Sequence, residues 1–411
     1  MKNMKILEIN KFNFPKGGAD KHFLDVRKLL EENGHQVAVF AMQHEKNLPN
    51  AWSKYFVSKV GYTNEYTAWE KIKGTGRMFF SFETTKKINL LLDEFKPDLV
   101  HIHNIYHQLS PAILFAIKKR GIPIVMSVHD YKIISPNHAL FLREEKYERC
   151  KNGKYYQCFF DRAIKNSYTK SFLAMFEMYW HERLGTYRKN IDLYLAPSEF
   201  VKKKLIEWGM DESKIAVFPH FISQNQNTTI LQYPVGDEKD FSGQKYFLYA
   251  GRISKEKGID KLLEIFAKNK EFKLLIAGAC ENEFEIPKMQ NVEYVGFLNQ
   301  AKLVKYVRSA LAVVSPSHLP ETFGLIALDA ISNGVPFIGF NEGAYGEIVE
   351  NGDHGFLVRD EEEMQTKMQA LWDGKVIFNP QKLEKMAQEK FGKAQYMAKI
   401  EKIFSEIQKY A

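Results

Sequence analysis

Short apolar strands alternate with helices along most of the chain, and they do so in two separate series. The first series opens with a strand at residues 4–9 and a helix at residues 19–33, which ends at Gly34. It continues with strands at 37–40, 98–103, 122–128, 192–196 and 214–218 and with helices at 84–95, 111–120 and 199–208. Because parallel strands need helical crossovers, this pattern predicts an α/β fold with a parallel sheet that is covered on both faces.

A polar stretch at residues 223–244 separates the two series and predicts a linker. The second series has strands at 246–250, 272–277, 292–295, 311–315 and 336–339, helices at 259–267, 300–309, 323–333 and 344–350, and further helices from residue 361. A chain of 411 residues is too long to fold around a single hydrophobic core, so two domains are expected. We therefore predict a Rossmann-like domain at 1–222, a second one at 245–390 and a C-terminal helix at 391–411. Ligands bind such sheets at the carboxyl ends of the strands, so we expect the two domains to face each other across an active-site cleft.

The positive charge of the chain belongs to its first half. Residues 1–200 hold 31 Lys and Arg against 21 Asp and Glu, whereas residues 201–411 hold 27 against 29. A basic half favours an anionic partner, either an anionic acceptor or a phospholipid surface. Zinc-finger spacing, a basic zipper and RNP-type aromatic motifs are missing from the sequence, so nucleic acid is not predicted as a partner.

A basic and aromatic segment at about 140–190 interrupts the first series. Within it, Phe172, Phe176, Tyr179 and Trp180 recur at helical spacing and predict an amphipathic helix. Such a helix can pack in a core or dock on a membrane or an acceptor, and the sequence leaves both alternatives open.

Three cysteines form an odd and sparse set, so no disulfide framework is expected and a reducing cytoplasm is the predicted location. A zinc site at Cys150 and Cys158 is a weak alternative. No apolar run reaches the roughly 20 residues that span a bilayer. Contact with the inner face of a membrane would therefore be peripheral.

The acids Glu321 and Asp329 stand eight residues apart between a predicted strand and a predicted helix. Eight residues make a little over two helical turns, so both acids are expected on one face, with Glu321 at the N-terminal end of the helix. This pattern suits a ligand with phosphate in the middle and hydroxyl groups at both ends, as in a nucleotide sugar. The alternative is an ordinary surface helix with two solvated acids.

A basic turn follows the first strand of the second series. Arg252 offers a planar fork for phosphate oxygens, Lys257 offers a compact charge, and Gly251 relieves crowding at the strand end. The alternative is a solvated turn. The glycine-bearing loop at residues 341–347 offers backbone N–H groups that can bind phosphate.

Two features of the first series lie at strand ends. Gly17 and Gly18 precede a helix, where the backbone can approach a phosphate or sugar closely, although a simple connector would look the same. His129 follows a strand and can donate or accept a hydrogen bond near neutral pH. His101 and His103, on a neighbouring strand, are interpreted as structural.

Together these residues resemble the retaining glycosyltransferases of family 4, which have the GT-B fold. The matching pieces cover nearly the whole chain, and the two most specific are residues 251–258 and 320–330. The resemblance implies four catalytic residues. Arg252 and Lys257 would bind and stabilise the leaving diphosphate, Glu321 would contact hydroxyl groups of the transferred sugar, and His129 would lie against that sugar.

The resemblance also implies donor-binding roles around these positions, at Gly17, Gly18, Gly251, Phe323, Gly324, Leu325 and Asp329. The family normally has Glu where this chain has Asp329, which is one methylene shorter, so the expected ribose contact would be lost, made through water or regained by a backbone shift. The family usually needs no metal, and neither a metal nor another cofactor is predicted.

The resulting hypothesis is a glycosyltransferase that moves a sugar from a nucleoside-diphosphate donor to a saccharide or lipid-linked acceptor, in cell-surface polysaccharide or glycolipid synthesis. The acceptor is expected on the basic first domain. Two alternatives stay open: a nucleotide-sugar epimerase of the same architecture, and a non-catalytic nucleotide-sugar binding module.

Overall fold

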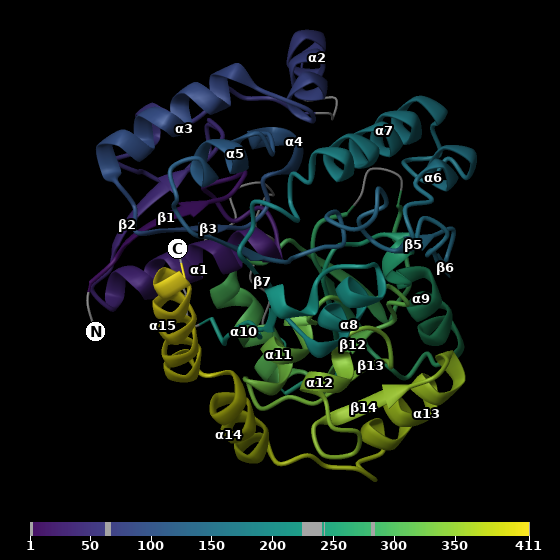
Figure 1. Cartoon of the computed structure of the whole chain (residues 1–411). Coiled ribbons are helices and arrows are strands. Elements are labelled where there is room, and N and C mark those ends of the chain that lie inside the picture. The colour runs from purple at the N-terminus through teal and green to yellow at the C-terminus, as the bar shows by residue number, and fades with distance from the viewer. Residues whose placement is uncertain (1–2, 62–66, 224–240, 242, 281–283, 411) are drawn as a thin grey trace. The chain divides into compact units, whose positions relative to one another are not determined.

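A computed structural model describes residues 3–61, 67–223, 241, 243–280 and 284–410. The chain divides into two compact units, and each is built on its own six-stranded parallel sheet (Figure 1). The first unit comprises Met1–Leu140, Tyr147–Pro219 and Tyr396–Ala411, and the second comprises Phe141–Lys146 and His220–Gln395. The predicted α/β class with two Rossmann-like sheets is confirmed.

The sheet of the first unit has the strand order β2-β1-β3-β4-β7-β8. Its strands are β1 (Lys5–Ile9), β2 (Gln36–Phe40), β3 (Leu99–Ile102), β4 (Ile124–Ser127), β7 (Leu193–Ala196) and β8 (Ile215–Val217), and its crossovers include α1 (Gly18–Glu32), α3 (Phe82–Phe95), α5 (Ile113–Lys118) and α8 (Glu199–Glu207). The strand order reverses between β1 and β3, which are neighbours in the sheet. Glu8 on β1 lies directly opposite His101 on β3.

The sheet of the second unit has the strand order β11-β10-β9-β12-β13-β14. Its strands are β9 (Phe247–Ala250), β10 (Leu274–Ala277), β11 (Val292–Gly296), β12 (Ala312–Ser315), β13 (Phe337–Phe340) and β14 (Gly355–Val358). The order reverses between β9 and β12, as in dinucleotide-binding sheets.

Helices cover both faces of this second sheet. Successive side chains of β9 lie on opposite faces of the sheet and belong to two different cores, Leu248 to one and Phe247 to the other. The first core is closed by α10 (Gln300–Ser309), α11 (Leu325–Ile331), α12 (Tyr345–Ile348) and α14 (Pro380–Phe391), and the other by α9 (Ile259–Lys268) and α13 (Glu361–Trp372). Strands buried on both faces explain the continuous apolar runs in the sequence.

The unit boundaries differ in two places from the predicted domains. The hairpin of β5 (Phe141–Leu142) and β6 (Glu145–Lys146) groups with the second unit, and α15 (Lys393–Tyr410) belongs from Tyr396 onward to the first unit. Tyr396 packs edge-on against Phe218 of the first unit, with 4.5 Å between the ring centroids. The apolar face of α15 is therefore buried against the first unit. The predicted linker at 223–244 falls almost entirely outside the described residues.

The predicted insertion contains α6 (Tyr156–Phe160) and α7 (Tyr168–Leu184), which pack against each other. The buried face of α7 is mostly small or polar, and Glu177 on that face contacts Lys132 at 2.7 Å and His107 at 3.0 Å. Burial raises the pKa of Glu177, but its contacts with Lys132 and His107 outweigh burial and lower that pKa to about 2. The aromatic side chains lie on the opposite, exposed face, so core packing is the wrong alternative for them.

Two elements of the first unit had no clear signal in the sequence. They are α2 (Ala68–Arg77) and the short helix α4 (Tyr106–Leu109), which contact each other. In the part of the chain that the structure describes, no helix is long and apolar enough to cross a membrane.

Candidate functional site

The candidate residues of the second unit follow the two strands between which the strand order reverses. Gly251 and Arg252 come directly after β9, and Glu321 lies in the loop between β12 and α11. Ligands of open α/β sheets bind at this switch point, beyond the carboxyl ends of the strands. The topology therefore gathers these loops at one edge of the sheet, where the sequence pattern placed a ligand.

Lys257 and Glu321, 64 residues apart in sequence, form an ion pair at this edge. Their side chains are 23% and 20% exposed, so each is covered on most sides but open to a ligand. Lys257 is placed by the short turn Lys255–Lys257, which ends at Gly258 with φ of +70°. A Cβ atom at Gly258 would lie 2.1 Å from the carbonyl oxygen of Pro316, so the close approach of these two loops requires glycine.

Arg252 lies on the same loop as Lys257 but is more exposed. Its guanidinium is 3.8 Å from the carboxylate of Glu256, and half of its side chain is exposed. Its carbonyl oxygen accepts a hydrogen bond from the Tyr249 hydroxyl at 2.6 Å. The backbone of this residue is therefore fixed, while its side chain lies at the surface.

A neighbouring loop holds the backbone of Glu321 in place. The N–H of Ala344 donates to the carbonyl of Glu321 at 2.9 Å, and a Cβ atom at Gly343 would lie 2.3 Å from the nitrogen of Glu321. Gly343 has φ of +63°, a conformation that favours glycine. The N–H of Ala344, expected to be available for phosphate, instead fixes the loop that carries Glu321.

The expectation that Glu321 and Asp329 share one helical face is wrong. Helix α11 begins only at Leu325, because Gly324 adopts φ of +97° against the ring of Tyr345, so Glu321 lies in the loop before the helix. Asp329 is on α11 and half-buried, and its backbone carbonyl accepts a hydrogen bond from the side chain of Asn333.

The side chain of Phe323 is part of the core. It packs edge-on against His220 and Phe391, with ring centroids 4.9 and 5.8 Å away. A donor-binding role at this position is therefore open only to its backbone.

In the first unit, Gly17 and Gly18 join β1 to α1. Gly17 precedes the first turn of α1 in an extended conformation, and both residues are exposed. A Cβ atom at Gly17 would meet only the carboxylate of Asp20, at 3.9 Å. The described structure therefore leaves room for a side chain at position 17, where Gly17 is the N-cap residue of α1.

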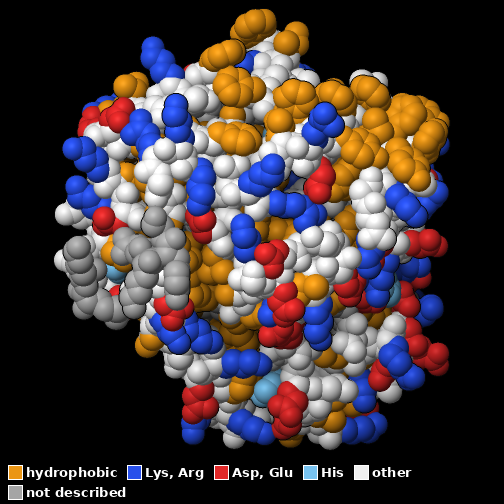
Figure 2. Space-filling view, viewed as in Figure 1, with side chains coloured by type: hydrophobic (Ala, Val, Ile, Leu, Met, Phe, Trp, Pro, Cys, Tyr) orange, Lys and Arg blue, Asp and Glu red, His pale blue; other side chains and the backbone are white. Residues whose placement is uncertain are grey.

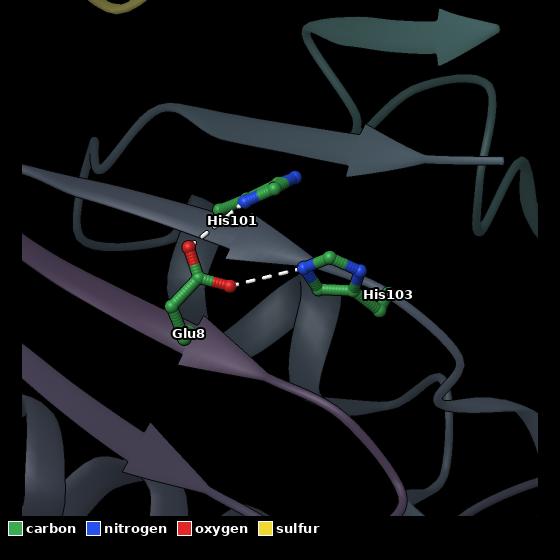
Figure 3. A group of neighbouring side chains, drawn as sticks. All are labelled: Glu8, His101 and His103. Atoms are coloured by element: carbon green, nitrogen blue, oxygen red, sulfur yellow. Dashed lines mark hydrogen bonds and ion pairs between the residues drawn. The ribbon is translucent and has the colours of Figure 1, made fainter. Parts of the chain in front are cut away.

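His129 is joined to a buried cluster of Glu8, His101 and His103, which Figure 3 shows. The carboxylate of Glu8 bonds Nδ1 of His101 at 2.9 Å and Nε2 of His103 at 3.0 Å. The other ring nitrogen of His103 lies 2.9 Å from Nε2 of His129, and that of His101 lies 2.9 Å from Oγ of Ser127. A continuous chain of hydrogen bonds thus runs from the half-buried His129 into the sheet.

Burial and neighbouring charge set the ionisation of this cluster. Glu8, His101 and His103 are fully buried. Burial raises the pKa of Glu8, but the neighbouring rings of His101 and His103 and their hydrogen bonds lower it to about 2. Burial, together with the neighbouring imidazole of His101, lowers the pKa of His103 to about 4. Near neutral pH, Glu8 is therefore an anion and His103 a neutral ring.

These three residues also bring one ligand atom each within 4.8 Å of one another, which is close enough to hold a metal ion. However, each nitrogen–oxygen pair lies at a normal hydrogen-bond distance, and a shared hydrogen accounts for it. Cys150 and Cys158 are buried free thiols that join no such group among the described residues.

The sequence interpretation took His101 and His103 as structural and overlooked Glu8. The missed signal was a pair of histidines at alternate positions of an otherwise apolar strand, with an acid inside the neighbouring apolar strand. Side chains two residues apart on a strand share a face, so the two histidines were to be expected on one buried face, where polar groups need partners.

Two family models match the chain. The model described as Glycosyltransferase Family 4 matches residues 16–226, just over half of the chain, and the model described as Glycosyl transferases group 1 matches residues 236–390. Among curated proteins, an uncharacterized 42.6 kDa protein in the cps region of Klebsiella pneumoniae is 23% identical, over 80% of this chain and 83% of that protein. An uncharacterized glycosyltransferase of Methanocaldococcus jannaschii is 25% identical, over 83% of this chain and 81% of that protein.

Solved structures show the same fold. Sucrose-phosphate synthase from Thermosynechococcus elongatus superposes with a TM-score of 0.71 at 16% identity, over the whole of both chains. HepE of Anabaena in complex with UDP-glucose has a TM-score of 0.62 at 17% identity, over 98% of this chain and all of that one. The chain therefore belongs to glycosyltransferase family 4, has the GT-B fold of two Rossmann-like domains, and is a glycosyltransferase.

Proposed function

We propose that this enzyme transfers a hexose-type sugar, with retention of anomeric configuration, from a nucleoside-diphosphate donor to a saccharide or lipid-linked acceptor. The observation that carries the proposal is the ion pair between Lys257 and Glu321 at the switch point of the second sheet. It places a cation and an acid side by side, as a donor with a charged diphosphate and a hydroxylated sugar requires. HepE, of the same fold, is recorded in complex with UDP and glucose. One relative is described as a protein in a cps region and another as a capsular polysaccharide biosynthesis glycosyltransferase, which supports cell-surface polysaccharide or glycolipid synthesis.

In this proposal, the cations stabilise the leaving group. The bond between the anomeric carbon and the diphosphate oxygen breaks, and its electron pair stays with the diphosphate, beside Arg252 and Lys257. The acceptor oxygen bonds the anomeric carbon on the same face and passes its proton to the departing diphosphate. Glu321 holds hydroxyl groups of the migrating sugar, so Lys257 exchanges part of its contact with Glu321 for the phosphate. No metal is required in this scheme, because fixed cations neutralise the developing charge.

A donor screen followed by turnover tests the proposal. Native protein is melted with UDP, GDP, ADP and their sugars, because a ligand that binds only the folded state raises the melting temperature. The stabilising donor is then incubated with saccharide acceptors, and the anomeric configuration of the product is read by NMR. Lys257→Ala should abolish nearly all transfer, whereas Lys255→Ala, on the exposed side of the same turn, should not. An epimer formed without acceptor would favour the epimerase, and tight binding without turnover would favour the binding module.

We further propose that an exposed aromatic surface on the first unit contacts an anionic membrane. We call this surface the aromatic face, and it consists of Trp69, Ile72, Phe80, Phe82, Phe160, Tyr168, Phe172, Phe176, Tyr179 and Trp180, each at least 38% exposed. Figure 2 shows hydrophobic side chains gathered where Figure 1 places α2, α6 and α7. Phe79, which follows α2, packs beside the α7 part of this face: its ring lies 5.5 Å from Phe176 and 6.1 Å from Trp180.

The charge around the aromatic face is basic. Lys165, Lys170 and Arg183 are exposed on or beside α7, and acidic lipid headgroups complement them. Exposed apolar patches of this extent mark interaction sites on soluble folds. A peripheral position at the inner face of a membrane would bring a lipid-linked acceptor to the first unit.

Vesicle sedimentation tests this second proposal. The triple variant Phe172→Ser, Phe176→Ser, Trp180→Ser should lose most of its binding to vesicles that contain anionic lipid. The control is Ile377→Ser, which removes a highly exposed apolar side chain of the second unit. Equal sedimentation of the triple variant and the wild type would overturn the proposal.

A further inference from the structure

Two loops of the first unit run side by side at the carboxyl edge of its sheet. They follow β1 and β2, which are neighbours in that sheet. The carbonyl of Lys11 accepts a hydrogen bond from the N–H of Met42 at 3.2 Å, and the carbonyl of Asn13 accepts one from the N–H of Leu48 at 2.9 Å. Ligands of open α/β sheets bind beyond the carboxyl ends of the strands, so side chains of these loops can reach a ligand.

Three partly exposed lysines of these loops, which we call the lysine cluster, gather around two rings. They are Lys11, Lys16 and Lys46. The ammonium groups of Lys11 and Lys16 lie 5.8 and 4.7 Å from the centre of the same ring, that of Phe12. The ring of His44 meets Phe12 edge-on at 6.0 Å, and its Nδ1 accepts a hydrogen bond from the backbone N–H of Lys46 at 3.2 Å.

The ionisation of His44 reflects the charge of these neighbours. Burial lowers the pKa of His44, and the ammonium groups of Lys59, Lys16 and Lys46 act in the same direction, against the effect of Glu45. His44 is therefore a neutral ring near neutral pH, and it adds no further charge to the lysine cluster.

The acids around the lysine cluster are fewer than its cations. Asp20 acts on two of the three lysines, but it is only 4% exposed and accepts a hydrogen bond from the side chain of Asn10 at 2.9 Å. The exposed acids Glu45 and Glu70 lie beside Lys59, at the margin of the cluster. In the described part of the chain, three ammonium groups thus surround one buried carboxylate. Each ammonium carries three hydrogens, so contact with a ring or an acid leaves others to donate.

We propose that the lysine cluster binds a phosphate or diphosphate group of the acceptor, so that this enzyme acts on a phosphorylated acceptor. The inference rests on the proposed function and deepens it, because it names the chemical class of the acceptor. A phosphate carries more negative charge than a carboxylate and has oxygens in several directions, so ammonium groups from two loops can contact it together. The phosphate itself does not react: it holds the acceptor while a hydroxyl group receives the sugar.

The first experiment measures binding to the full chain by isothermal titration calorimetry without a donor. The probe is butyl glucosyl diphosphate, and the controls are neutral butyl glucoside and butyl glucuronide, which carries a carboxylate. Because the donor site can also hold a diphosphate, the titrations use the variant Arg252→Ala, Lys257→Ala. The diphosphate should bind at least tenfold more tightly than either control. Equal or tighter binding of the glucuronide would overturn the proposal.

Substitutions in the same background assign the binding to the lysine cluster. Lys11→Gln with Lys16→Gln, and separately Lys46→Gln on the other loop, should weaken diphosphate binding by about tenfold to a hundredfold, as expected when charge-assisted hydrogen bonds are lost. Lys86→Gln is the control, because it removes an exposed lysine of α3 outside the cluster. Thermal unfolding confirms that each variant is folded. Unchanged binding in both cluster variants would overturn the proposal.

The second experiment measures transfer with the donor found in the screen. Lys11→Gln with Lys16→Gln, in the otherwise native chain, should raise the KM for the diphosphate acceptor about tenfold or more and leave the KM for the neutral acceptor unchanged. Equal kcat/KM for the two acceptors in an active wild type would overturn the proposal. Diphosphate binding at the cluster without transfer from any donor would instead count against the proposed function.

Discussion

The two units differ in how deeply they bury the charged side chains of their candidate sites. The first unit buries Glu8 completely and surrounds it with histidines of its own sheet, whereas the second unit leaves Lys257, Glu321 and Arg252 partly exposed on loops. A buried carboxylate is costly unless it is paired and hydrogen-bonded, so the network of the first unit must be complete before any ligand arrives. The exposed groups of the second unit can exchange partners when a ligand binds. The charged groups of the first unit are thus fixed in its core, whereas those of the second unit lie on loops and remain partly open to solvent.

Removal of Glu8 should have the largest effect on stability. Glu8→Leu leaves two buried histidines without their shared acceptor and should lower the free energy of unfolding by about 3–5 kcal/mol, as when one partner of a buried pair is lost. Glu321→Leu, in the partly exposed pair, should change it by less than about 1 kcal/mol. Denaturant unfolding followed by circular dichroism measures both. Similar losses in the two variants would break the contrast between the units.

Removal of the exposed guanidinium of Arg252 should lower the activity of the enzyme and leave its stability unchanged. Arg252→Ala should lower kcat by about 10²–10³-fold, the usual effect of losing one group that stabilises developing charge, with an unchanged melting temperature. Lys255→Ala is the matched control, because it removes a cation from an exposed position three residues away. A fall in the melting temperature of Arg252→Ala would mean that this side chain also supports the fold.

A methyl group at Gly343 tests whether the loop contact positions Glu321. Gly343→Ala should displace the backbone of Glu321 and reduce transfer by about a hundredfold, since a shift of about 1 Å has that effect in other enzymes. Gly352→Ala carries a similar left-handed strain, but its added Cβ meets no atom within 4 Å. The control should therefore lose about 1–2 kcal/mol of stability and keep its activity. Equal activity in the two variants would refute the positioning role of Gly343.

The stability of the first unit should fall when the pH is lowered, because of its buried network of Glu8 and histidines. The pKa of His103 falls from 6.5 to about 4 on folding, and that of Glu8 falls from 4.5 to about 2. Between these values the unfolded chain binds more protons, so stability rises with pH and is lost as the pH falls from about 6.5 toward 2. Each such group contributes a slope of about 1.4 kcal/mol per pH unit. His103→Asn should flatten the upper part of this dependence, whereas His318→Asn, at a partly exposed histidine of the second unit, should not.

The periodic part of the fold could be predicted, and its three-dimensional contacts could not. Predicted helix 300–309 matches α10 in full, because a capping Asn299 and a regular apolar spacing define it locally. Helix α11 was predicted two residues too long at each end, since its start depends on Gly324 packing under Tyr345, a contact from another loop. The sequence predicted a cation and an acid at the switch point, and the structure pairs Lys257 with Glu321.

The histidine cluster shows why the rest of the site was missed. Its members come from β1, β3 and β4, so their contacts depend on strand order and register, which periodicity does not reveal. The same holds for α7, whose aromatic spacing predicted a helix but not which side is buried. Glu177 faces inward there because Lys132 and His107 lie beneath it.

The last helix has a consequence for biosynthesis. Tyr396 and Phe404 of α15 pack against His22 and His101, so the first sheet receives part of its cover from residues translated more than three hundred positions later. Domains of most proteins can mature one after another as they leave the ribosome. Here the first unit lacks part of the cover of its sheet until the second unit and α15 have been translated. A ribosome-stalled chain that ends before α15 should therefore be more sensitive to proteases in its first unit than the released chain.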